Sequence, residues 1–156
     1  MTSEELMVRA VELSHVHMRA GSGGPFGALV ACDGAVVAEG WNQVTSTNDP
    51  TAHAEVVAIR RACAALGRFD LRGCEIYTSC EPCPMCLGAI HWARLDRVWY
   101  GNDRADAAAI GFDDEMLYRE IGLPLGARAT PIRQLLPDHA RSAFEAWAAK
   151  SDKVVY

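Results

Sequence analysis

The stretch "CEIYTSCEPCPMCLGAIHWARLDRVWYG", residues 74–101, decides the fold of this chain. Residues 74–79 read as a strand, after which prolines end the strand and start a helix over residues 84–94. Residues 97–101 read as a second strand. Strands joined through a helix form a right-handed crossover and lie parallel. We therefore predict an α/β domain with a partly parallel sheet.

The residues before this unit supply a helix and a hairpin. Residues 3–20 carry an apolar stripe at helical spacing, and Gly21 is the expected stop. Residues 26–32 and 35–41 flank an Asp-Gly pair, which is a strong signal for a tight hairpin turn. These elements predict two antiparallel strands that extend the sheet.

Further helices and one more strand complete the predicted domain. A helix should run to about Leu66, with Asn48 or Asp49 as its cap and Pro50 in its first turn. The remaining predicted elements are a short helix at 113–122, an edge strand at 127–132 and a last helix at 137–150. The sum is a single domain, residues 1–156: a three-layer α/β/α sandwich with a mixed five-stranded sheet.

Composition narrows the classes of function. The chain has 156 residues, a net charge of -5 and scattered basic residues, a balance that argues against nucleic-acid binding. It has neither an apolar run of membrane-spanning length nor the features of a signal peptide, so we expect a cytoplasmic protein without a membrane partner. In that compartment its 6 cysteines are not expected to form disulfides.

Two helix starts carry the residues of a metal site. Cys83 and Cys86 are three residues apart at the start of one helix, so both thiols lie on one face. The free N–H groups at a helix N-terminus favour the thiolate form. With His53 at the start of the other long helix, they give one nitrogen and two sulfurs, a set that suits tetrahedral zinc.

A carboxylate next to this ligand set indicates catalysis. Three protein ligands leave a fourth position open to water, whose pKa zinc lowers to about 7. Glu55, two residues beyond His53, is placed to accept and pass on a proton. The alternatives are a closed structural zinc site with Cys80 or Cys74 as fourth ligand, and a zinc-stabilised binding module without catalysis.

The pattern of His53 and Glu55 followed by "PCPMC" is the signature of zinc-dependent nucleobase deaminases. Together with "GGPFGA", "NDPTAHAEV", "IGFDD", "FEAW" and a terminal Tyr156, it makes nearly the whole chain resemble the cytidine deaminase superfamily. Within that superfamily the chain closely resembles the bacterial guanine deaminases. The resemblance implies a cytidine deaminase-like fold, a zinc cofactor and the hydrolysis of guanine to xanthine and ammonia.

The resemblance also implies roles for residues outside the metal site. Asn42 would read the purine ring, Phe26 would pack on it and Ala54 would contact it. Asp114 would be a second acid that helps protonate the departing amine. Tyr156 would close over the site, and in this family that residue comes from the partner subunit of a domain-swapped homodimer, which implies a swap of residues from about 130 to 156. Without the resemblance, Asn42 reads as a turn residue, Phe26 as core, Asp114 as a helix cap and Tyr156 as a frayed end.

Other substrates stay open on sequence grounds. A guanosine deaminase, or a deaminase of another aminopurine or a triazine, differs from a guanine deaminase mainly in the size of the pocket. A tRNA adenosine deaminase shares the metal motifs but needs a cationic surface and a flipped nucleotide, and the acidic balance argues against it.

Overall fold

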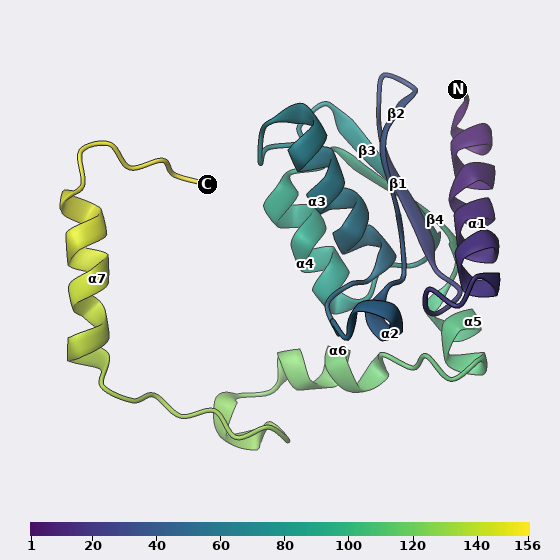
Figure 1. Cartoon of the computed structure of the whole chain (residues 1–156). Helices are drawn as coiled ribbons and strands as arrows, with labels where there is room; N and C mark the ends of the chain where they lie inside the picture. Colours follow the sequence, from purple (N-terminus) through teal and green to yellow (C-terminus); the bar gives the residue numbers. More distant parts are fainter. The chain divides into compact units, whose positions relative to one another are not determined.

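The computed structural model describes all 156 residues, which divide into two compact units, Met1–Asp114 and Glu115–Tyr156. The first unit is built on a four-stranded sheet of order β2-β1-β3-β4 (Figure 1). Its strands are β1 (Gly27–Cys32), β2 (Ala35–Trp41), β3 (Cys74–Cys80) and β4 (Arg97–Asn102). Strand β1 is antiparallel to both β2 and β3, and β3 is parallel to β4, which confirms the predicted hairpin and crossover.

Helices cover both faces of this sheet, as the three-layer prediction requires. Helix α1 (Ser3–Arg19) packs on one face, and helices α3 (Ala54–Leu66) and α4 (Pro84–Ala93) lie on the other (Figure 1). The α1 side buries Leu6, Ala10, Leu13, Leu29, Ala31 and Tyr77. The α3/α4 side buries a larger cluster that includes Val30, Ala58, Ile59, Leu71, Ile76 and Ile90. Because buried clusters pack on both faces of the same sheet, the N-termini of α3 and α4 are fixed relative to it.

The predicted fifth strand is absent, so the expectation of five strands is wrong. Residues 127–132 contain no strand, and the N–H groups of Ala127 and Ala129 have partners nearby in the chain instead. The Ala129 N–H donates to the Glu120 carboxylate at 3.0 Å, and the Arg128 guanidinium donates to the Leu123 carbonyl at 3.1 Å. An N–H group that already has a local partner gains little from pairing with a sheet edge.

The second long helix also begins later than predicted. The α3 helix starts at Ala54 with His53 as its N-cap residue, not at Pro50. Asp49 accepts from the Thr51 N–H at 2.8 Å and from the Thr51 hydroxyl at 2.7 Å, so it caps a turn and not a helix. Asn48 adopts a left-handed conformation that ends a short helix, α2 (Val44–Thr47), which the sequence did not predict. The late start places the imidazole of His53 at a helix N-terminus.

Two of the six cysteines depart from the expectation that they stay unpaired. Cys32 of β1 and Cys74 of β3 are directly opposite in the antiparallel register and form a disulfide. Cys63, Cys80, Cys83 and Cys86 are free thiols. The prediction was wrong because it was based on the expected cytoplasmic location. It did not consider the strand register, which brings Cys32 and Cys74 together.

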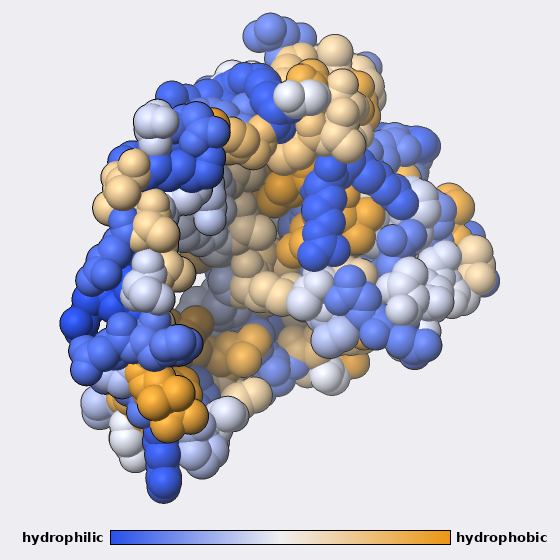
Figure 2. Space-filling model, turned by 60° about the vertical axis from the view of Figure 1, so that its left-hand side comes forward, coloured by the Kyte–Doolittle hydropathy of each residue, from blue (hydrophilic) through white to orange (hydrophobic).

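The chain after the sheet is helical. Helix α5 (Arg104–Ala109) closes the first unit, and the second unit contains α6 (Glu115–Gly122), a 3₁₀ turn (Leu125–Ala127) and α7 (Pro137–Ala149). None of the residues from 115 to 156 is buried. Hydrophobic side chains reach the molecular surface in Figure 2. The large ones most exposed in the second unit are Ile121, Leu135, Leu136, Phe144, Val154, Val155 and Tyr156. No helix in the structure has the length and apolar character needed to span a membrane.

Candidate metal centre and catalytic site

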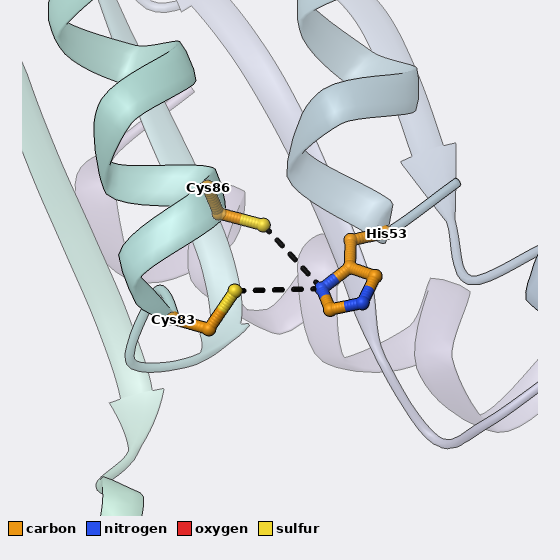
Figure 3. Close-up of side chains that lie close together, drawn as sticks. All are labelled: His53, Cys83 and Cys86. Carbon is orange, nitrogen blue, oxygen red and sulfur yellow. Dashed lines mark hydrogen bonds between the residues drawn. The ribbon is translucent and has the colours of Figure 1, made fainter. Parts of the chain in front are cut away.

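His53, Cys83 and Cys86 meet where two helices begin. His53 is the N-cap residue of α3, Cys83 is the N-cap residue of α4, and Cys86 lies in the first turn of α4. The Nδ1 atom of His53 lies 3.6 Å from the Cys83 Sγ and 3.5 Å from the Cys86 Sγ (Figure 3). All three predicted ligands are thus brought together, and their donor atoms lie within 4.8 Å of one another.

These distances fit a tetrahedral zinc ion. Zinc lies about 2.3 Å from sulfur and about 2.0–2.1 Å from nitrogen, so an N···S edge of the tetrahedron is about 3.6 Å long. The two observed edges have this length. A closed four-ligand site is not formed, because Cys74 is paired with Cys32 and the Cys80 thiol contacts the Asp103 carbonyl at 3.8 Å. The donor set is that of a site with one position left for water or substrate.

Hydrogen bonds and burial within the cluster favour the thiolate form of one of its two cysteines. The pKa of Cys83 is lowered to about 4, first by a hydrogen bond from the Cys86 side chain and then by the His53 side chain, against the effect of burial. The pKa of Cys86 is raised by its hydrogen bond to Cys83 and by burial. The pKa of His53 is raised chiefly by its hydrogen bond with Cys83. The metal-free cluster therefore holds one thiolate, and a metal ion would displace the remaining proton.

Glu55 lies beside the ligand set without belonging to it. It sits in the first turn of α3, is only 6% exposed, and accepts a hydrogen bond from the Cys86 thiol at 3.4 Å. Burial raises the pKa of its carboxyl group. A buried carboxyl with a raised pKa, next to a metal centre, is suited to exchanging protons near neutral pH.

Asn42 and Ala54 lie on the chain that leads into α3. Asn42 follows β2 directly and is 7% exposed, and the next N–H, that of Gln43, donates to the Ala52 carbonyl at 2.9 Å, one residue before His53. Ala54 is fully buried at the first helical position, where a backbone N–H has no carbonyl partner within the helix. Both predicted substrate contacts are therefore held next to the ligand His53.

Phe26 and Asp114 lie in the same unit as the metal cluster, and each has a partner that the sequence did not reveal. The Phe26 ring meets the Phe112 ring edge-to-face, with centroids 4.9 Å apart. Asp114 Oδ1 lies 3.8 Å from Arg104 Nε, and burial raises the Asp114 pKa while Arg104 opposes that effect. The partners are Phe112 and Arg104, and neither had a predicted role. The stretch "IGFDD", residues 110–114, contains Phe112, but only Asp114 in it had a predicted role.

Tyr156 lies in the second unit, at the end of the chain. Its side chain is exposed, in keeping with the other apolar residues of that segment. The predicted closure over the substrate involves a different unit from the one that holds the metal cluster, and it stays a prediction.

Comparison with known proteins places this geometry in a family. Residues 1–102 match the model of the cytidine and deoxycytidylate deaminase zinc-binding region. Over 156 residues, covering 100% of both chains, the sequence is 51% identical to a guanine deaminase of Bacillus subtilis. The crystal structure of the guanine deaminase from Bacillus subtilis superposes with a TM-score of 0.97 at 51% identity, and covers 100% of this chain and 99% of that one.

A second group of relatives is less similar to the chain. A tRNA-specific adenosine deaminase of Agrobacterium fabrum is 44% identical over 86 residues, which is 55% of this chain and 57% of that one. The full-length likeness, by contrast, includes the residues of the second unit. The identity is therefore higher, and covers more of the chain, for the guanine deaminase than for this adenosine deaminase.

Proposed function

This chain belongs to the family of zinc-binding cytidine and deoxycytidylate deaminases, and we infer that it is a zinc-dependent aminohydrolase that converts guanine and water to xanthine and ammonia. One observation carries the reaction type. The donor atoms of His53, Cys83 and Cys86 are spaced as a zinc ion requires, beside a buried carboxylate, that of Glu55, which is not part of the ligand set. The choice of guanine rests on the full-length likeness to a guanine deaminase.

The residues of the chain divide the work of this hydrolysis. When bound, zinc supplies a Lewis acid that lowers the pKa of water to about 7. Glu55 accepts the proton of the attacking water and delivers it to the ring nitrogen next to C2. Glu55 or Asp114 then protonates the departing amine. The backbone N–H of Cys83, the N-cap residue of α4, would stabilise the negative charge that develops.

Three residues position the base. Phe26, supported edge-to-face by Phe112, offers an aromatic surface for the purine. Ala54 offers a backbone N–H from the first turn of α3. Asn42 offers a side-chain amide from the end of β2, next to His53 in the fold. These contacts would hold C2 of the purine toward the metal centre.

A substrate panel tests the proposal. We expect ammonia release from guanine, with much slower release from guanosine, adenine, cytosine, cytidine or tRNA. Zinc content is measured on the same preparation. Faster ammonia release from guanosine or another aminopurine would identify that compound, and not guanine, as the substrate. Release from tRNA would favour the adenosine deaminase relatives, against the net charge of -5. Bound zinc without ammonia release from any of these compounds would indicate a zinc-stabilised binding module without catalysis.

We further propose that the working form is a homodimer in which the segment from about residue 130 onward is exchanged between subunits. The support is the apolar character of a unit that buries nothing: Phe144 and Trp147 lie three residues apart on α7 and are 78% and 44% exposed. Residues this apolar need a partner surface. A second copy of the chain would supply it by exchange of an identical element. A cytoplasmic location stays a prediction.

Deletion of residues 152–156 should lower guanine turnover sharply while zinc content and fold are kept. The tail carries Val154, Val155 and Tyr156 at the extreme C-terminus, where they are exposed in the single chain. As a lid it would exclude water and leave no room for a ribose at N9. The measurement is the ratio of turnover on guanine to turnover on guanosine, which should fall in the truncated protein.

The control for this deletion is Tyr156→Phe, which keeps the length and the ring of the tail but removes the hydroxyl. If it behaves as the intact protein, the lid acts by shape; if it behaves as the deletion, the hydroxyl itself contacts the substrate. Equal guanine turnover in the truncated and intact proteins would show that the tail is a frayed end.

A further inference from the structure

The side-chain oxygen of Asn42 is fully engaged by the backbone. Its Oδ1 accepts from the Gly24 N–H and from the Val44 N–H, each at 3.2 Å. An amide oxygen offers two lone pairs, so these two donors use its accepting capacity. The main chain of Asn42 is held as well, since its N–H donates to the Phe26 carbonyl at 3.0 Å. The side chain cannot rotate its oxygen toward a substrate without breaking both bonds.

The nitrogen of the same amide is left for a ligand. No protein group accepts a hydrogen bond from the Asn42 Nδ2. The structure contains no buried side-chain nitrogen or oxygen without a partner, so this Nδ2 must reach solvent although the residue is only 7% exposed. Asn42 therefore presents two N–H donors and no acceptor to whatever binds beside it.

Gly23 maintains this orientation by its lack of a side chain. A Cβ atom at position 23 would lie 2.4 Å from the Asn42 Oδ1 and 2.4 Å from the Asn42 carbonyl oxygen. The Gly23 backbone is not in the left-handed region, so an alanine there is excluded by contact with Asn42 and not by its own conformation. Because one of the two atoms is backbone, the clash is not relieved by a simple side-chain rotation.

We propose that Gly23, with the N–H groups of Gly24 and Val44, is a positioning element that fixes Asn42 as a donor-only reader of the base. The site then selects purines that present an acceptor, a carbonyl oxygen or an unprotonated ring nitrogen, at the edge facing Asn42. A purine with an N–H donor at that edge would leave two donors opposed and unpaired, which is costly in a closed site. This inference rests on the proposed function and adds residues that act through Asn42.

Gly23→Ala tests the positioning role. We expect a rise of roughly ten- to a hundredfold in KM for guanine, the scale of one or two lost hydrogen bonds, with a smaller change in kcat and unchanged zinc content. Ser22→Ala is the matched control. It lies in the same loop, and its hydroxyl makes no hydrogen bond. An unchanged KM in Gly23→Ala, or an equal rise in Ser22→Ala, would overturn the role of Gly23.

A pair of variants tests the polarity of the amide even if Gly23→Ala fails to fold. Asn42→Asp keeps the shape and the two backbone bonds but replaces the donor by an acceptor, whereas Asn42→Ala removes the group. A donor-only reader predicts a lower kcat/KM for guanine in Asn42→Asp than in Asn42→Ala. The reverse order would mean that the amide accepts from the substrate. Absence of guanine turnover in the unmodified protein would refute the proposed function instead.

Discussion

Glu55→Gln should lose at least about 10²-fold in the rate of guanine deamination while keeping zinc and fold, because the amide cannot accept the proton of the attacking water. The structure makes the substitution conservative: Glu55 is not one of the three metal-binding residues, and glutamine has nearly the same shape. The measurements are kcat for guanine, zinc per chain and the melting temperature. The loss should fall on kcat and kcat/KM together, since the proton moves only during reaction.

The control for this substitution is Glu75→Gln. Glu75 lies at the opposite end of β3 from Cys80 and accepts hydrogen bonds from the Tyr77 hydroxyl and the Trp99 indole, each at 2.9 Å. Its loss should affect stability but not the rate of the folded enzyme. Near-normal turnover in Glu55→Gln would remove Glu55 from the chemistry and leave Asp114 as the proton carrier to be tested.

The features that the sequence predicted well depend on neighbours in the chain. Cys83, Pro84 and Cys86 lie within one turn of helix, so their common face follows from helical spacing. The hairpin turn at Asp33 and Gly34 adopts left-handed φ values of 50° and 73°, as that dipeptide indicates. Convergence with His53 depended on a known motif, since no local rule brings the starts of α3 and α4 together.

The features that the sequence did not predict are of two kinds. In one, a side chain has two possible partners nearby in the chain; in the other, its partner is distant in the sequence. Asp49 could either cap a helix or accept hydrogen bonds from Thr51 in a turn, and the sequence does not show which of the two forms. The pairing of Cys32 with Cys74 follows from the register of β1 on β3, which is fixed only when the sheet forms. The donor-only amide of Asn42 likewise depends on Gly24 and Val44, which meet it only in the folded chain.

Cys83→Ala should lose zinc, lose activity and melt at a lower temperature. Cys83 makes no side-chain capping bond at the start of α4, so its removal takes away a metal ligand without removing a helix cap. A ligand that binds only the folded state stabilises it, by about 4 kcal/mol when free zinc is about a thousand times its Kd. For a chain of this size that corresponds to a fall of roughly 8–16 °C in melting temperature. Zinc analysis, ammonia release and thermal unfolding check the three effects.

Cys63→Ala is the matched control, because Cys63 is a half-buried free thiol outside the metal cluster. It should keep zinc and activity. A chelator separates metal loss from packing loss: it should lower the melting temperature of the intact protein and of Cys63→Ala, but leave that of Cys83→Ala unchanged. Full activity in a Cys83→Ala protein without metal would contradict the zinc mechanism. A chelator-sensitive melting temperature in Cys83→Ala would show that His53 and Cys86 still hold the ion. Loss of activity in that variant would then be assigned to the geometry of the centre and not to the absence of metal.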